Sequence, residues 1–377
     1  MLIFAAASAG MVWYGIHSQI IIITLPAYAE YGIQQTDKKT ISFYRYHNEQ
    51  KIEEKTTLLW SQDLQDNIAA VTSAWLATAQ EEDLVQKNNK VDIVAVTSQE
   101  HEAFISFSHT LFDSQMPLLQ KWLLIESLIL TLRKIFPDLQ TLHLLVQGNI
   151  FADEHIDCSQ SIPLVSFMQT YTASKTHKKN NGEKLTVVIH PHGDKQTTGR
   201  IIRCEFERNY MRQLAQELKN ILEKNKQVTV LITHEIGQSA TQEDNAMLAN
   251  RLPADLYIDL QAYESKKMLP ELSCYFQLYN PLTDFWQKRD TGLALTPLHA
   301  AYLKNITQSC AFGLSIVENL KKNGANHFFI NPLRGIPLTS LVGISVPSIT
   351  IECGFQNIDQ IKQVAQRLAD GLLDAFF

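Results

Sequence analysis

The sequence has few cysteines, no excess of positive charge and no charged residue near its N-terminus. Its 5 cysteines are odd in number and form no Cys-x-x-Cys pair, which argues against a disulfide framework or a zinc ribbon. The chain has 33 Lys and Arg residues against 39 Asp and Glu residues. Proteins that bind nucleic acids by neutralising phosphates have an excess of basic residues, so a nucleic-acid partner is not expected. Hydrophobic residues make up 45% of the 377 residues, which predicts a folded chain of about two domains.

The N-terminal stretch before Glu30 contains no Asp, Glu, Lys or Arg. It is apolar enough to enter a bilayer, which takes about 20 residues, although His17 interrupts it. Ala27-Tyr28-Ala29 follows Pro26 and fits the small-x-small pattern of a cleavage site. We therefore predict a signal peptide or membrane anchor at residues 1–29 and an extracytoplasmic location. The alternative, a buried helix followed by a core strand, is less favoured because the stretch shows no amphipathic spacing.

Residues 40–150 are predicted to form a smaller α+β domain. Apolar residues at helical spacing, and runs of strand-forming residues between polar turns, follow the order β-α-β-β-α-β. That order predicts a sheet with helices on one face. The expected strands are residues 41–46, 91–96, 103–108 and 142–146, and the expected helices are residues 63–80 and 117–136.

Residues 185–377 show the alternating pattern of an α/β domain, after a polar linker at residues 169–184. The alternation predicts a mostly parallel sheet with flanking helices, in which chemistry gathers at the carboxyl ends of the strands. The expected strands are residues 185–189, 227–233, 254–260 and 347–352. The expected helices are residues 205–225 and a final helix with apolar positions Ile361, Val364, Ala365, Leu368 and Leu372.

Polar residues stand where these strands end. His190 and His192 follow the first strand, Gln261 follows the third, and Glu352 ends the fourth. Glu205 starts the first helix. A carboxylate on a buried strand is costly unless something compensates for it. A polar turn or a helix cap explains any one of these residues alone, but their order within one α/β unit indicates a functional site.

The same residues resemble motifs of the zinc-dependent N-acetylmuramoyl-L-alanine amidases of the amidase-3 type. The family opens with Asp-Pro-Gly-His-Gly-Gly, and residues 189–194 here read IHPHGD. The family's Glu four residues before an Asn corresponds to Glu205 and Asn209 in EFERN. Its ADLFISIHAN-like strand corresponds to ADLYIDLQAY, and its PavLvEtGFlsN-like motif to PSITIECGFQN. The resemblance spans residues 185–377 and is most specific in its last segment.

The resemblance implies a Zn²⁺-dependent peptidoglycan hydrolase that cleaves the amide between the lactyl group and L-alanine. It implies that His192 and Glu205 are metal ligands and Glu352 is the catalytic carboxylate. The third ligand position holds Gln261, whose amide oxygen is a poorer zinc donor than imidazole. His190 is a candidate substitute ligand and His234 a weaker one. This pattern predicts a weakened or absent zinc site.

Residues 40–150 resemble a GerMN-type domain of sporulation and cell-envelope proteins. The resembling segments are FYRY, AFISFS, LTLRKIF and LLVQG. The resemblance implies association with peptidoglycan or with a protein, without a catalytic site. The acidic segment at residues 153–158 is predicted to be a solvated connector rather than a metal site, because it lacks the glycine of a calcium loop.

Two functions follow from the sequence. The first is an exported peptidoglycan amidase with an incomplete zinc site, attached to the membrane if the N-terminal segment stays in place. The second is a catalytically inactive amidase-fold module that binds peptidoglycan or an envelope protein. A cytosolic α/β hydrolase is a third interpretation, and the uncharged N-terminus argues against it.

Overall fold

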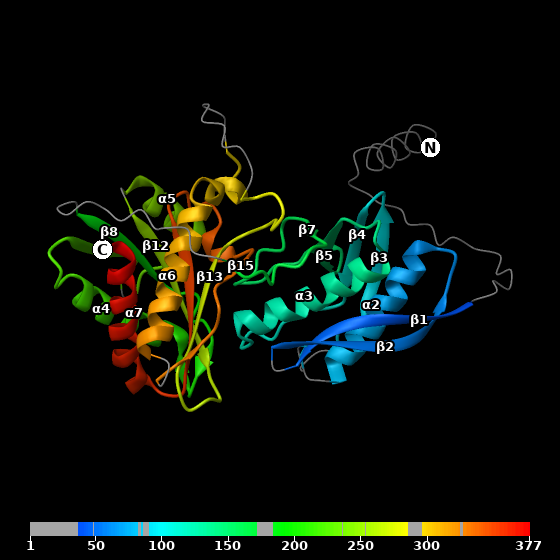
Figure 1. Ribbon diagram of the computed structural model, residues 1–377, viewed down its shortest axis with the longest axis horizontal. Coiled ribbons are helices and arrows are strands. Elements are labelled where there is room, and N and C mark those ends of the chain that lie inside the picture. Colours follow the sequence, from blue (N-terminus) through cyan, green and yellow to red (C-terminus); the bar gives the residue numbers. More distant parts are fainter. Residues whose placement is uncertain are drawn as a thin grey trace, which may run out of the picture. The chain divides into compact units, whose positions relative to one another are not determined.

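The computed structural model describes residues 37–47, 49–81, 84–85, 90–171, 184–235, 237–252, 254–285, 296–324 and 327–377 (Figure 1). Residues Lys38–Phe377 form one compact unit. The predicted signal peptide or anchor at residues 1–29 and most of the predicted linker lie outside the described residues. No helix within the described ranges is long and apolar enough to cross a membrane.

The N-terminal lobe, residues 37–171, contains two sheets and two long helices. Strands β3, β4, β5 and β6 pair in that order and β7 also pairs with β5, while β1 and β2 form a separate two-stranded sheet. The elements are β1 (Asp37–His47), β2 (Gln50–Trp60), α2 (Leu64–Glu81), β3 (Ile93–Gln99), β4 (Glu102–Phe107), α3 (Leu118–Ile135), β5 (Thr141–Val146), β6 (Asn149–Ile150) and β7 (Ile162–Pro163).

The predicted strands and helices of this lobe are present, and the structure adds β2, β6 and β7. The prediction of one sheet is wrong for the first strand, because β1 pairs with β2 apart from the β3–β7 sheet. β2 was not predicted, because its sequence QKIEEKTTLLW is half charged and polar and no residue of it is fully buried. The core comes mainly from α3, whose sequence LLQKWLLIESLILTLRKI buries thirteen of its eighteen residues. A helix that is apolar on nearly every side must be covered on nearly every side, so α3 is a central element of the fold.

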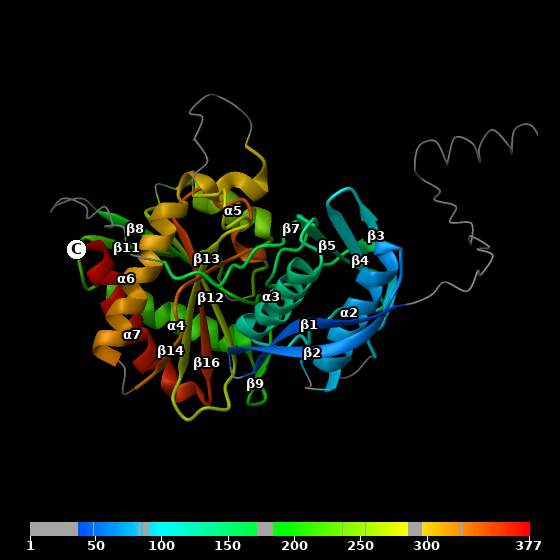
Figure 2. The ribbon, with the colours of Figure 1, turned by 45° about the vertical axis from the view of Figure 1, so that its right-hand side comes forward.

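The C-terminal lobe, residues 184–377, is a seven-stranded mixed sheet with flanking helices (Figure 2). The strand order is β11-β8-β12-β16-β13-β14, and β15 also pairs with β13. Only the β13–β16 pair in this sheet is antiparallel among the described pairs. Strands β9 and β10 form a separate two-stranded sheet. The strands of the lobe are β8 (Leu185–Pro191), β9 (Ile201–Ile202), β10 (Glu205–Phe206), β11 (Val228–Ile232), β12 (Leu256–Glu264), β13 (Glu271–Gln277), β14 (Phe329–Ile330), β15 (Arg334–Ile336) and β16 (Ser348–Phe355).

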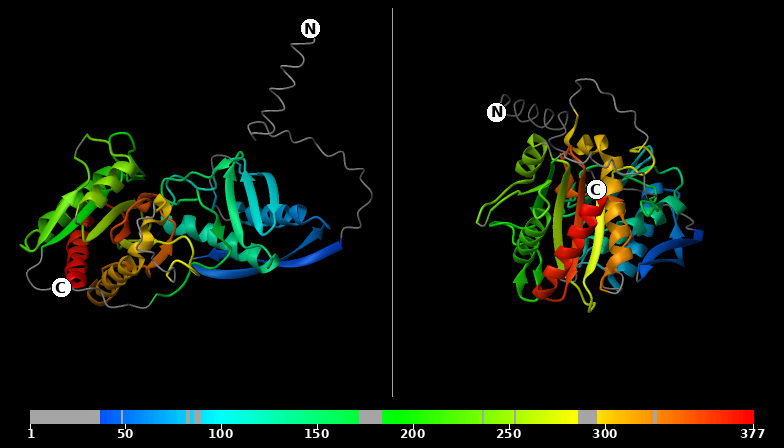
Figure 3. Two further views of the ribbon diagram at one scale, coloured as in Figure 1. Left: turned by 90° about the horizontal axis from the view of Figure 1, so that it is seen from above. Right: turned by 60° about the vertical axis from the view of Figure 1, so that its left-hand side comes forward.

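Three long helices of this lobe lie side by side, with α7 between α4 and α6 (Figure 3). The apolar stripe predicted for the last helix is buried as expected. The α-helices are α4 (Glu207–Leu222), α5 (Gln242–Arg251), α6 (Ile306–Gly324) and α7 (Ile361–Phe376), and three short 3-10 helices span Leu298–Lys304, Thr339–Leu341 and Ile358–Gln360.

The two lobes meet through the segment between β6 and β7 and through the N-terminus of α3. Ile156 forms a β-bridge with Leu338, and the Thr339 N–H donates to the His155 carbonyl oxygen at 3.0 Å. His155 and Ile156 are buried. The prediction that residues 153–158 form a solvated connector is therefore wrong, because this segment pairs with the C-terminal lobe.

Candidate functional site

The register of three parallel strands brings the predicted polar residues onto one face of the sheet. On β12, Asp259 pairs with His190 of β8, and Gln261 pairs with Glu352 of β16. Residues paired in this way project to the same face, as do residues two apart on a strand. All four side chains are buried. They form two adjacent polar groups, one around Glu352 and one around His190.

Glu352 is a buried carboxylate with a complete set of protein partners. Its side chain is 1% exposed. Oε1 lies 3.0 Å from Nη1 of Arg200 and accepts the backbone N–H of Leu118 at 2.8 Å. The Tyr275 hydroxyl donates to Oε2 at 3.4 Å. Burial raises the pKa of Glu352, although the Arg200 guanidinium opposes this shift.

The Leu118 N–H is the first of helix α3, so the negative charge of Glu352 lies at the positive end of the helix dipole. The residue before it, Pro117, supplies no side-chain cap. Glu352 therefore caps a helix that belongs to the other lobe, 234 positions away in the chain. This contact places the N-terminus of α3 directly against the predicted catalytic carboxylate.

Arg200 is the cation of this group and is 2% exposed. Besides the pair with Glu352, its Nη1 lies 3.9 Å from Oε1 of Glu207. Its guanidinium also donates to two carbonyl oxygens, that of Ala262 at 2.9 Å and that of Met116 at 3.1 Å. One guanidinium thus balances two buried carboxylates and binds the segment before α3.

The second carboxylate of the group is Glu207 rather than the predicted Glu205. Glu207 begins α4, and its oxygens accept the backbone N–H groups of Arg200 at 2.8 Å and Ala262 at 2.6 Å. Gly199 has a φ of +69°, and a Cβ there would lie 2.6 Å from Oε2 of Glu207. Only glycine allows the backbone to approach the carboxylate this closely.

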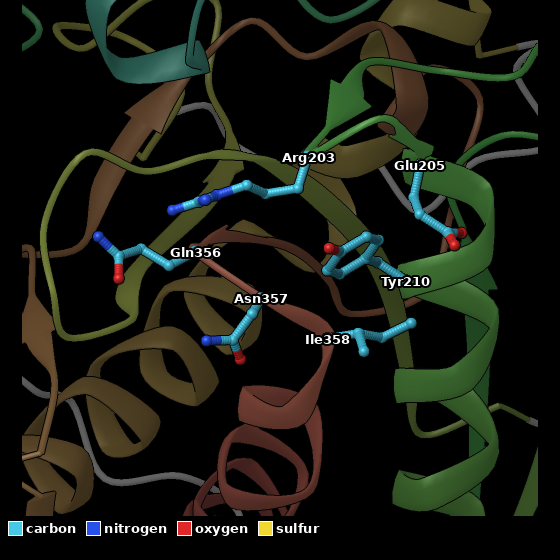
Figure 4. A pocket seen from close by; sticks show the side chains of 6 residues that line it. All are labelled: Arg203, Glu205, Tyr210, Gln356, Asn357 and Ile358. Atoms are coloured by element: carbon cyan, nitrogen blue, oxygen red, sulfur yellow. The ribbon is translucent and has the colours of Figure 1, made fainter.

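Glu205 lies elsewhere because a short hairpin separates it from the helix. It pairs with Ile202 across a two-residue turn in which Arg203 and Cys204 both have positive φ. Its exposed carboxylate accepts the Asn209 side-chain N–H at 3.0 Å. Glu205 lines an open pocket, together with Arg203, Tyr210, Gln356, Asn357 and Ile358 (Figure 4). The structure thus does not bring Glu205 together with His192 or Gln261.

Only one end of the buried Gln261 amide is engaged, because its Oε1 has no hydrogen-bond partner among the described residues. Its amide Nε2 donates to Oδ2 of Asp259 at 2.7 Å. The same Oδ2 accepts the hydroxyls of Ser340 at 2.7 Å and Thr350 at 3.2 Å. Gln261 therefore helps to fix the carboxylate of Asp259, a residue that the sequence analysis did not select.

The second polar group consists of His190, His192 and Asp259. One donor atom from each lies within 4.8 Å of the other two. Nε2 of His190 lies 3.9 Å from Oδ1 of Asp259. Burial lowers the pKa of His190 to about 3, so its ring is neutral near pH 7. His192 is half-buried, and its ring centroid lies 5.2 Å from that of His155 in the N-terminal lobe.

The remaining predicted histidine, His234, is buried, and its Nε2 lies 3.2 Å from the carbonyl oxygen of Gly193. Among the described residues, two groups of side chains could hold a metal ion, and His234 belongs to neither. The second such group joins His192 to Glu154 and His155.

Comparison with known proteins finds a family match in the C-terminal half. Residues 186–370 match the N-acetylmuramoyl-L-alanine amidase family. No curated protein matches the chain. The match spans slightly less than half of the chain and includes His190, His192, Asp259, Gln261 and Glu352. We refer to residues 186–370 as the amidase region.

Solved structures of amidases are similar to the same half of the chain. The N-acetylmuramoyl-L-alanine amidase from Clostridium difficile 630 is 19% identical, with 51% of this chain and 96% of that chain covered and a TM-score of 0.38. The catalytic domain of CwlV from Bacillus (Paenibacillus) polymyxa var. colistinus is 16% identical, covering 51% and 95% with a TM-score of 0.37. AmiC2 of Nostoc punctiforme is 17% identical, covering 51% and 97% with a TM-score of 0.38.

The residues that resemblance assigns to zinc do not fit a zinc ion in this structure. Glu205 is exposed and lines a different pocket, while both oxygens of Glu207 accept backbone N–H groups. A guanidinium already lies between Glu207 and Glu352. A second cation there would be repelled by Arg200. By contrast, two imidazoles and a carboxylate are a donor set that zinc prefers, and His190, His192 and Asp259 supply that set.

Proposed function

We propose that the chain acts on peptidoglycan as an N-acetylmuramoyl-L-alanine amidase that cleaves the lactyl–L-alanine amide outside the cytoplasm. The observation that supports this proposal most directly is the family match over residues 186–370, which includes Glu352 on the buried strand β16. A carboxylate whose pKa is raised by burial is suited to carrying a proton during amide hydrolysis. The predicted N-terminal segment would place the protein in the envelope, with or without attachment to the membrane.

Catalysis by Glu352 requires its present partners to change. Both of its oxygens accept hydrogen bonds, and the Leu118 N–H and the Arg200 guanidinium share one of them. A substrate amide can meet this carboxylate only after the N-terminus of α3 moves away. We therefore interpret the arrangement as a closed form of the site, in which the N-terminal lobe, itself predicted to be GerMN-like, restricts access.

A non-hydrolytic role is the second candidate, and one observation favours it. The Arg200 guanidinium lies where two buried carboxylates converge, and Gln261 stands at the ligand position that the family fills with histidine. An amidase fold with this internal ion pair could bind peptidoglycan or an envelope protein without cleaving it.

A cleavage assay separates the two candidates. The full chain is incubated with purified peptidoglycan and Zn²⁺, and new α-amino groups of L-alanine are identified by labelling and mass spectrometry. Hydrolysis is expected in the wild type, with a rate lowered by about 10²–10⁴-fold in Glu352→Gln because the proton carrier is lost. Glu264→Gln, which changes an exposed carboxylate at the end of β12, is the matched control.

Each outcome of this assay is decisive. If the wild type releases no amine but sediments with peptidoglycan, the non-hydrolytic role is correct. If Glu352→Gln cleaves as fast as the wild type, Glu352 is not the proton carrier and the proposed mechanism is wrong.

A further inference from the structure

We propose that the amidase region binds one Zn²⁺ ion through His190, His192 and Asp259. This site keeps His192 from the ligand set that the resemblance implied, takes in the candidate substitute His190, and replaces Glu205 and Gln261 with Asp259. It goes beyond the proposed function, because metal binding here can be measured whether or not the protein hydrolyses peptidoglycan.

The backbone places the three donors together before any metal binds. His190 and Asp259 are register partners on adjacent strands, so their side chains lie beside each other on one sheet face. The His192 N–H donates to the Leu260 carbonyl oxygen at 2.8 Å, which continues the strand pairing one residue past Pro191. His190 and His192 are therefore two apart on an extended segment and project in the same direction.

Asp259 supplies the observation that points to a ligand. Its side chain is completely buried, and Oδ1 has no hydrogen-bond partner among the described residues, although it lies 3.9 Å from Nε2 of His190. A buried carboxylate oxygen without a partner costs free energy, about 1–3 kcal/mol for an ordinary polar group and more for a charged one. A cation between Oδ1 and the two imidazoles would remove that cost.

The other atom of each buried ligand is held by a neighbour. Oδ2 of Asp259 accepts from Gln261, Ser340 and Thr350, and Nδ1 of His190 lies 3.0 Å from the Thr233 hydroxyl. Outer contacts of this kind orient metal ligands and select the histidine nitrogen that faces the metal. Gln261 thus acts through Nε2 as a positioning residue for Asp259, and its Oε1 is left without a hydrogen-bond partner among the described residues.

The distances suit zinc after a small movement. Donors 2.0–2.1 Å from a tetrahedral zinc ion lie about 3.3 Å apart, so atoms now within 4.8 Å need to close by at most about 1.5 Å. Three protein ligands leave a fourth position open for water or substrate. The half-buried side chain of His192 gives this position a route to solvent.

The competing group of Glu154, His155 and His192 is a poorer cation site. Nδ1 of His155 lies 3.0 Å from the buried Nζ of Lys121, which pairs with Asp153 at 2.6 Å. An ammonium group this close repels an added cation. Glu154 is exposed, so binding would also have to order its side chain.

Metal titration of the full chain tests the assignment. After chelator treatment and dialysis, Zn²⁺ is added in a calorimeter, and Co²⁺ in parallel as a visible-absorption probe. We expect one ion per wild-type chain. Loss of a ligand is expected to weaken binding at least about 100-fold in Asp259→Asn and in His190→Asn, since loss of an outer contact alone costs about 10–100-fold.

Two variants serve as controls. Glu154→Gln tests the competing group, and His143→Ala removes a half-buried histidine of β5 that pairs with Glu102. Both should bind Zn²⁺ like the wild type. The proposal is overturned if wild-type protein binds no ion with a Kd below about 10 μM, a threshold that is weak for three protein ligands. It is also overturned if Asp259→Asn keeps its affinity for Zn²⁺ while Glu154→Gln loses it. Circular dichroism checks that each variant is folded before its binding is measured.

Discussion

Glu352 and Asp259 are two buried carboxylates on adjacent strands of one sheet, and their surroundings differ in kind. Glu352 has a guanidinium, a helix N-terminus and a tyrosine hydroxyl around it. Asp259 has three neutral donors on Oδ2 and no partner in the described chain on Oδ1. The first is neutralised by the protein itself, whereas the second lacks a cation.

This difference assigns metal binding and proton transfer to two separate groups of side chains, although the sequence motifs imply a single site for both. In the family resemblance, the metal and the proton carrier belong to one site. Here the cation next to the proton carrier is Arg200, and the donor set that suits a metal lies toward β8. One buried carboxylate of this sheet is therefore neutralised by a side-chain cation, while Oδ1 of the neighbouring carboxylate has no hydrogen-bond partner among the described residues.

The largest expected effect comes from removing the internal cation. Arg200→Met leaves Glu352 and Glu207 as buried carboxylates without a counter-charge, which typically costs about 3–5 kcal/mol. Urea unfolding should show this loss in the free energy of unfolding. Arg203→Met is the control, because its exposed pair with Glu264 at 3.5 Å contributes less than about 1 kcal/mol.

A double variant checks the cause of that loss. Adding Glu352→Gln to Arg200→Met removes one of the stranded charges and should restore part of the stability. If Arg200→Met is as stable as the wild type, Arg200 does not neutralise the buried carboxylates Glu207 and Glu352. The closed form of the site would then depend on other contacts.

A smaller effect is expected at the contact between α3 and Glu352. Leu118→Pro removes the N–H that Glu352 accepts, and proline fits the first position of a helix after Pro117, whose φ and ψ are −58° and 147°. Leu118→Ala removes the buried side chain but keeps the N–H. The proline variant should be less stable than the alanine variant by about 1.5–3 kcal/mol, the value of a hydrogen bond to a charged group. Indistinguishable urea midpoints would mean that Glu352 does not cap α3.

Sequence patterns predicted the elements of both lobes better than they predicted the site. The strands around Gln261 and Glu352 are apolar runs, so their burial and alternation with helices follow from composition. The role of Arg200 does not, because its partners include Met116, 84 positions away, and such a contact leaves no local pattern. The exchange of Glu205 for Glu207 depends on the turn at Arg203 and Cys204, where neither residue type signals a positive φ.

Asp259, by contrast, was visible in the sequence. In ADLYIDLQAY, Asp259 and Gln261 are two polar residues two positions apart within an apolar strand, so they must share one face. The predicted strand ends at Leu260, so Gln261 stands out as the residue after it, but β12 extends to Glu264 and both Asp259 and Gln261 lie inside it. Buried polar residues within a strand should therefore be considered together with those at its end.

The smallest effect is expected from Asp259→Asn in metal-free protein. The asparagine oxygen can accept the donors now bound to Oδ2, and its amide group, which faces Nε2 of His190, can donate where the carboxylate could not. The free energy of unfolding should therefore stay within about 1 kcal/mol of the wild type. With Zn²⁺ at 100 times its Kd, the wild type should gain about 2.7 kcal/mol and the variant almost nothing. Melting curves recorded with chelator and with Zn²⁺ measure the stability of the metal-free variant and the gain on adding Zn²⁺. A large loss of stability in metal-free Asp259→Asn would show that Asp259 stabilises the fold in the same way as Glu352.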